Sequence, residues 1–170
     1  MAGGDKVQTG RRFTCALLVG VVLMSAGLAG AEEVEQEGIE VHHPWARPTP
    51  PVSPINGAVY FSVTNHRDEP IRLEAVQAPW TAHASLHQSR QKGGTVRMEV
   101  VDGGVLIGPG ETMRFEPNGY HVMLMDLTDP LKEGDRFPMT LEFRGESVDI
   151  EVQVRQVPAR ESEADEPSQN

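Results

Sequence analysis

The chain has 170 residues, which is enough for one domain with additional segments at its ends. Its formal net charge of −10 argues against nucleic acid as a partner and favours cations or a basic protein surface. The single cysteine, Cys15, excludes a disulfide bond within the chain.

The first 31 residues have the features of a secretory signal peptide. A basic start containing Arg11 and Arg12 is followed by the apolar stretch 15–30, and Ala29-Gly30-Ala31 is a small-residue cleavage motif. We therefore predict a periplasmic protein whose mature chain begins at Glu32, exported by either the Sec or the twin-arginine route. A membrane anchor is the weaker interpretation, because glycines and a serine interrupt the apolar stretch and no later segment is long enough to span a bilayer.

The mature chain divides into three segments. Residues 32–38 form an acidic leader, residues 39–157 form the folded body, and residues 158–170 form an acidic tail that we expect to be disordered. Removal of the signal peptide takes away three basic residues and one acidic residue, so the formal charge becomes −12. It also removes Cys15, which excludes thiolate metal ligands and cysteine nucleophiles.

The body consists of short apolar segments separated by turn residues. Alternation of apolar and small or polar residues, as in Gly57–Asn65, is the period of a strand, and no later segment has a helical period. Gly93-Gly94 and Gly145-Glu146 predict two hairpins. Eight or nine such strands predict an all-β protein, an antiparallel β-sandwich. The predicted strands cover residues 57–65, 71–77, 85–90, 95–101, 105–107, 111–117, 120–127, 136–144 and 147–155.

Histidines and methionines beside turns are the candidates for chemistry. His87 and Met98 lie on the two arms of the first predicted hairpin, and His121 and Met123 begin a strand after the turn at Asn118-Gly119. Antiparallel strands can bring these ends together, and two imidazoles with two thioethers suit Cu(I) better than harder cations. The alternative is that the histidines are surface residues and the methionines fill the core.

The order and spacing of these four residues resemble the periplasmic copper chaperone family of the PCuAC type, whose pattern is His-x10-Met-x21-His-x-Met. Here the three intervals are 10, 22 and 1 residues, and the extra residue falls in the turn-rich segment 100–111. The segments HPWARPTPP (43–51), GAVYFSVTN and PNGYHVMLMDL are also similar to that family, so the resemblance covers nearly the whole body.

The resemblance implies a cupredoxin-like Greek-key β-sandwich that binds one Cu(I) through His87, Met98, His121 and Met123. It also implies delivery of copper to an acceptor, such as the CuA centre in cytochrome c oxidase subunit II or another copper chaperone. Met125 matches a recurrent family methionine outside these four. Because no cysteine remains for a CuA or blue-copper site, this interpretation describes a carrier and not an enzyme. Binding of Cu(II) stays open, since two histidines also suit that ion.

Two other functions fit the same residues. A copper-buffering or resistance protein would use the same ligands without a dedicated acceptor. An exported β-sandwich that binds a protein or a polymer would need no metal at all. His83 shares the predicted strand face of His87 and is a candidate accessory ligand.

Overall fold

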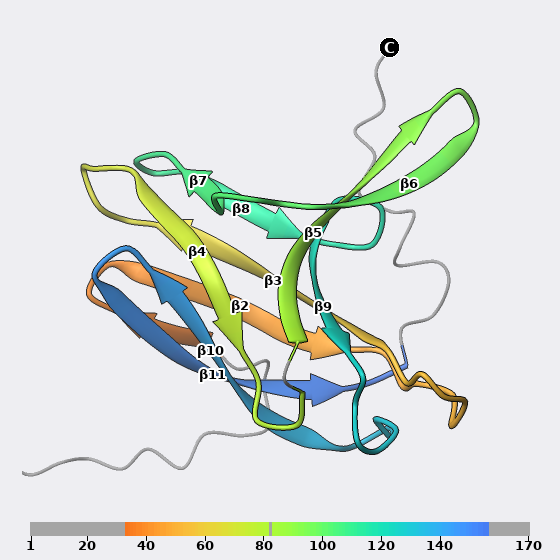
Figure 1. Ribbon diagram of the computed structural model, residues 1–170. Coiled ribbons are helices and arrows are strands. Elements are labelled where there is room, and N and C mark those ends of the chain that lie inside the picture. Colours follow the sequence, from red (N-terminus) through yellow and green to blue (C-terminus); the bar gives the residue numbers. More distant parts are fainter. Residues whose placement is uncertain (1–32, 82, 157–170) are drawn as a thin grey trace, which may run out of the picture. The chain divides into compact units, whose positions relative to one another are not determined.

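A computed structural model describes residues 33–81 and 83–156 of the chain (Figure 1). These residues contain eleven β-strands and no helix, so none of them forms a helix able to cross a membrane. The predicted signal peptide (1–31) and acidic tail (158–170) lie outside the described residues. The strands are β1 (Glu33–Gln36), β2 (Ile39–Ala46), β3 (Gly57–Asn65), β4 (Ile71–Gln77), β5 (His83–Lys92), β6 (Thr95–Val100), β7 (Val105–Ile107), β8 (Thr112–Phe115), β9 (Tyr120–Met125), β10 (Arg136–Phe143) and β11 (Glu146–Val154).

The strands form one continuous sheet that folds over on itself into a two-layer sandwich (Figure 1). The strand order is β6-β5-β9-β8-β3-β2-β11-β10-β4-β7, and β1 pairs with β2. Strands β2 and β11 share only two residue pairs, Trp45 with Gln153 and Ala46 with Val154, and the sheet passes from one layer to the other there. Most pairings are antiparallel, and the predicted all-β sandwich is confirmed.

Strands β1 and β2 are the two that the sequence pattern did not predict. In β2, Val41 and Ala46 are buried, but His43 has a positive φ of 51° and Pro44 follows it. The register with β3 shifts there, from His42 opposite Ser62 to Trp45 opposite Tyr60, which is a β-bulge. The bulge breaks the alternation from which a strand is recognised. Strand β1 lies in the acidic leader and has no apolar alternation of its own.

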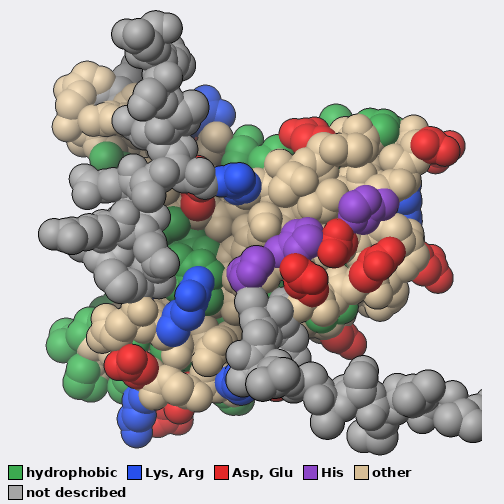
Figure 2. Space-filling model, turned by 180° about the vertical axis from the view of Figure 1, so that it is seen from behind, with side chains coloured by type: hydrophobic (Ala, Val, Ile, Leu, Met, Phe, Trp, Pro, Cys, Tyr) green, Lys and Arg blue, Asp and Glu red, His purple; other side chains and the backbone are tan. Residues whose placement is uncertain are grey.

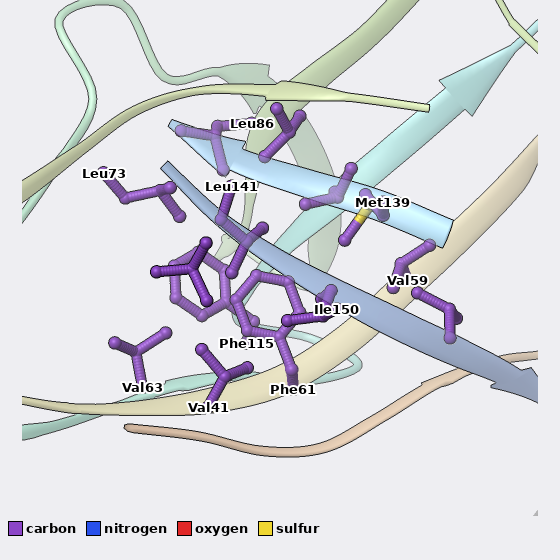
Figure 3. Packing of buried hydrophobic residues seen from close by; sticks show 14 of the residues in the cluster. Val41, Val59, Phe61, Val63, Leu73, Leu86, Phe115, Met139, Leu141 and Ile150 are labelled. Carbon is purple, nitrogen blue, oxygen red and sulfur yellow. The ribbon is translucent and has the colours of Figure 1, made fainter. Parts of the chain in front are cut away.

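The core lies between the two layers, where alternate residues of each strand point inward. Strand β11 is the clearest case, because Val148, Ile150, Val152 and Val154 are buried and the residues between them are exposed. Figure 3 shows side chains of both layers meeting around Phe61 and Phe115, whose rings stack with centroids 4.4 Å apart. The predicted alternation is therefore what buries the core, and it leaves the other face of each strand free for polar residues.

Asn65 is a buried polar side chain at the end of β3, and all its hydrogen-bonding groups have partners. Its Nδ2 donates to the carbonyl oxygens of Glu69, Ile107 and Gly108, and its Oδ1 accepts from the backbone N–H of Arg67. One amide thus holds together the turn after β3 and the turn after β7, so burial of this group stabilises rather than destabilises the fold.

Gly104 precedes β7 at a point where the backbone of β4 leaves no room for a side chain. Its φ is +77°, and a Cβ placed there would lie 2.3 Å from the carbonyl oxygen of Leu73. Gly103 has a similar φ of +82° but nothing within 4 Å of its Cβ position.

We expect Gly103→Ala to lower the free energy of unfolding by about 1–2 kcal/mol because of the positive φ alone. Gly104→Ala should cost a further ~1–3 kcal/mol, because the strands must separate. Urea unfolding of both variants measures the difference, and equal losses would contradict the close approach.

Candidate metal centre

The pairing of β5 with β9 brings the two predicted histidines together. In the antiparallel register His87 lies opposite His121, Ser85 opposite Met123, and His83 opposite Met125. Residues directly opposite one another point to the same face. The rings of His87 and His121 have centroids 6.0 Å apart and are tilted by 33°. The three residues of the predicted His-Met set that lie on these strands therefore share one face.

The alternate residues of the same strands point into the core and fix this register. Leu86 of β5 and Val122 and Leu124 of β9 have exposed fractions of 4%, 0% and 1%. A slip of one residue would turn these side chains outward and the histidines inward. The hydrophobic effect on the inner face thus determines which residues meet on the outer face.

Met98 reaches the same face from the hairpin of β5 and β6. It lies opposite Ser89, and Val100, two residues further along β6, lies opposite His87. Met98 is therefore diagonal to His87 on the same face. Strand β6 is exposed along its whole length, and the end of the hairpin projects from the sandwich (Figure 1). Met98 is 56% exposed, whereas His121 is only 3% exposed. The structure places all four predicted residues on one face of three adjacent strands, with Met98 as the open member.

His87 and His121 each have one ring nitrogen without a hydrogen-bond partner among the described residues. Nδ1 of His121 lies 3.1 Å from the carbonyl oxygen of Gly119, which can only accept, so Nδ1 carries the proton and Nε2 keeps a lone pair. Nε2 of His87 lies 3.0 Å from the hydroxyl of Ser85. Nδ1 of His87 and Nε2 of His121 are buried and have no hydrogen-bond partner among the described residues. Buried nitrogens without partners are unfavourable unless something binds them, and they fit the lone-pair requirement of a metal ion.

The aromatic ring of Tyr60 lies beside the buried His121, and that of Trp45 packs against Tyr60. The ring of Tyr60 lies 6.4 Å from that of His121 and 4.6 Å from that of Trp45, between centroids. The guanidinium groups of Arg47 and Arg155 lie 5.9 and 5.2 Å from the centroid of the Trp45 ring. Sequence analysis did not identify these neighbours of the site, nor Ser85 and Gly119. Their positions depend on strand register and on the bulge in β2, which no local pattern specifies.

The other histidines and Met125 take different places. His83 is exposed at the start of β5 and faces Met125, four residue pairs from His87 and His121. His42 and His66 belong to a separate cluster with carboxylates on β1 and β2. The structure therefore separates the predicted four from the remaining histidines of the described chain.

Burial, and to a smaller extent the neighbouring His121, lower the pKa of His87. The unfolded chain then binds a proton more readily than the folded one once the pH falls below the ordinary histidine pKa of about 6.5. The His87 contribution to stability is therefore complete above that pH and decreases as the solution is acidified through the lowered folded-state pKa. Neutral imidazole, the form that can bind a metal, is favoured at neutral pH.

We expect the metal-free chain to lose stability between pH 7.5 and 5 more steeply than the variant His87→Gln. Glutamine keeps a polar side chain but does not titrate, so it removes this proton uptake by the unfolded state. Urea unfolding at several pH values, with a chelator present, measures both slopes. Parallel slopes for the two proteins would contradict the expected role of partly buried His87.

Comparisons with known proteins agree with this architecture. A family model described as "Putative lipoprotein LpqE-like" matches residues 39–154. "Uncharacterized protein RP573" of Rickettsia prowazekii is 33% identical over 102 residues, which cover 59% of this chain and 56% of that protein's length.

Two solved structures that resemble this chain are of copper-bound proteins. The copper-bound PCuAC domain from PmoF2 is 25% identical, with a TM-score of 0.61, and the match covers 74% of this chain and 99% of that domain. The solution structure of CuI-DR1885 from Deinococcus radiodurans is 29% identical, with a TM-score of 0.51, over 66% of this chain and 76% of that one.

Proposed function

Because this chain belongs to the LpqE-like family and to the PCuAC type by its fold, we propose that it is an exported copper chaperone. Its cargo is one Cu(I) ion, bound by His87, Met98, His121 and Met123. The protein carries copper and performs no reaction on it.

The observation that carries this proposal is the pair of buried ring nitrogens on facing strands. Nδ1 of His87 and Nε2 of His121 lack hydrogen-bond partners in the described chain, and Met98 and Met123 lie on the same face as these rings. Imidazole with thioether is a soft, neutral ligand set, which selects Cu(I) over Zn²⁺, Ca²⁺ or Mg²⁺. Hydrogen bonds donated by Nε2 of His87 to the Ser85 hydroxyl and by Nδ1 of His121 to the carbonyl oxygen of Gly119 hold the two rings in place, as outer partners of metal ligands do.

Unequal exposure of the ligands suits a carrier. His121 is buried on the outer face of the sheet, whereas Met98 is more than half exposed on the projecting hairpin. An acceptor can therefore displace the exposed thioether first while the imidazoles still hold the ion. A blue-copper or CuA electron-transfer site would instead use a cysteine, which the mature chain lacks.

A copper carrier needs an acceptor protein that takes the ion from it. The family resemblance favours a CuA centre such as that of cytochrome c oxidase subunit II. The acidic surface of the chain would attract a basic docking face and increase the rate of encounter. Export to the periplasm is supported by the putative-lipoprotein family and by the signal peptide predicted from the sequence.

Replacement of the two thioethers by leucine should remove Cu(I) binding and leave the fold intact. Leucine has nearly the volume of methionine but no sulfur, so Met98→Leu with Met123→Leu tests the ligands rather than the packing. We expect the affinity to fall by more than the ~10–100-fold typical of losing an outer partner of a metal site. Competition titration against a coloured Cu(I) chelator measures the affinity, and native mass spectrometry gives the stoichiometry.

Met125→Leu is the matched control, because Met125 lies on the same face but outside the proposed ligand set. Its affinity for Cu(I) should equal that of the wild type. Equal binding by the double variant and the wild type would disprove the ligand assignment. Absence of Cu(I) binding by the wild type would leave the chain as an exported sandwich without copper as cargo.

Transfer to an acceptor separates a chaperone from a copper buffer. The copper-loaded chain is mixed with a purified apo CuA domain. It should lose its ion to this domain faster than it loses the ion to a small chelator that does not dock, because docking lets the acceptor replace Met98 directly. Chromatographic separation and metal analysis of both proteins measure the transfer. Release at the rate of the undocked chain, whatever the acceptor concentration, would indicate a buffering protein.

A further inference from the structure

A second cluster of potential metal ligands lies on the outer face of β1, β2 and β3. Glu33 of β1 is paired with His42 of β2, and Glu40 precedes His42 by two residues, so all three point to one face. Figure 2 shows histidine side chains in a row on the surface, beside several acidic side chains. One ligand atom from each of Glu33, Glu40 and His42 lies within 4.8 Å of the other two.

The distances around His42 leave both of its ring nitrogens in contact with an oxygen. Nδ1 lies 3.4 Å from Oε1 of Glu33, and Nε2 lies 3.4 Å from Oε2 of Glu40 and 3.1 Å from Oγ1 of Thr64. Whichever nitrogen binds an ion, the other can donate its proton to a neighbouring oxygen, which is how metal-bound histidines are held in position. The side chain of His42 is 20% exposed, so the ring is largely fixed by its neighbours and still accessible.

Glu40 is also held in position. Nε2 of His66 lies 2.6 Å from its Oε2, and the side chain of Glu40 is 23% exposed. The hydrogen bond from His66, together with the nearby His42, lowers the pKa of Glu40. The carboxylate is therefore ionised at neutral pH and oriented toward His42.

Two carboxylates that approach the same imidazole repel each other unless positive charge lies between them. The strongly negative chain increases this repulsion. A divalent cation removes it, and an imidazole with carboxylate oxygens is a donor set that Zn²⁺ and its first-row neighbours accept. In a tetrahedral zinc site with bonds of about 2.0–2.1 Å the ligand atoms are roughly 3.3–3.4 Å apart. Each ring nitrogen of His42 lies 3.4 Å from one carboxylate oxygen, Nδ1 from Glu33 and Nε2 from Glu40, so one histidine–carboxylate pair already has this spacing. The second carboxylate lies within 4.8 Å and reaches the same ion by a small side-chain movement.

We propose that Glu33, Glu40 and His42 form a second metal site, which takes a borderline divalent cation such as Zn²⁺ and is separate from the His-Met site. Water fills the remaining coordination positions, and His66 and Thr64 orient the ligands from outside. The bound ion joins β1 to β2, so it also holds the acidic leader strand on the sheet. This site uses nitrogen and oxygen donors where the His-Met site uses nitrogen and sulfur, so the two sites select different ions.

The test is titration of Zn²⁺ into the untagged, metal-free full chain, followed by calorimetry and native mass spectrometry. To exclude zinc on the other histidine pair, it is repeated in the background His87→Gln with His121→Gln. We expect one Zn²⁺ per chain in both proteins. Glu40→Gln with His42→Gln should lower the affinity by more than about 100-fold, and His66→Gln, which removes an orienting partner, by ~10–100-fold.

His43→Gln is the matched control, since His43 is the adjacent exposed histidine but lies outside the ligand cluster. Its Zn²⁺ affinity should equal that of the wild type. Hydrogen exchange gives a second measurement, because Zn²⁺ should slow exchange of the amides of β1 in the wild type but not in the double variant. Cu(I) binding should be the same in both, so failure of this site and failure of the proposed copper site are distinguishable.

Less than a tenfold loss of affinity in Glu40→Gln with His42→Gln would overturn the proposal. So would the absence of stoichiometric Zn²⁺ binding by the wild type, in which case the cluster is an ion-pair network only. Equal losses in the His43→Gln control and the double variant would also overturn it, since they would assign binding to the histidines in general.

Discussion

The antiparallel register between β5 and β9 is the constraint on which both the fold and the His-Met site depend. Leu86, Val122 and Leu124 are buried on one side of this strand pair, and His87 faces His121 on the other. Because side chains alternate strictly along a strand, burial of the first set fixes the position of the second. Burial of the core thus also positions the two histidines of the proposed copper site, and no separate interaction is needed to bring them together.

The site combines a fixed part with an open part. The imidazole of His121 is buried beside Tyr60, and its Nδ1–H donates a hydrogen bond to the carbonyl oxygen of Gly119. Met98 comes from the outermost strand of the sheet, where β6 has a partner on one side only. In the proposed copper site this asymmetry would let the buried His121 keep hold of the ion while the exposed Met98 provides a route for exchange.

The bulge in β2 gives the outer face its second feature. His42 and Trp45 are three residues apart, yet they lie opposite Ser62 and Tyr60, which are two apart. The extra residue lets both side chains point outward from one strand. As a result, one continuous face carries the carboxylate-histidine cluster, the pair of Trp45 and Tyr60, and the His-Met site. Two donor sets of different softness are separated by an aromatic patch within one sheet.

The fold class and the two glycine hairpins could be predicted from the sequence, and so could His87, Met98, His121 and Met123 as candidate ligands. Alternation along β11 and the turn residues at Gly93 and Gly145 are local signals, and local signals can be read without knowing what each strand packs against. The sequence did not indicate β1 and β2, because a bulge and an acidic composition remove the alternation. Strand pairing in the folded chain sets His87 opposite His121, places Tyr60 beside His121, and brings Glu33, Glu40 and His42 together on another part of the same face. These contacts join strands that are distant along the chain, and their register is set by burial of the opposite face.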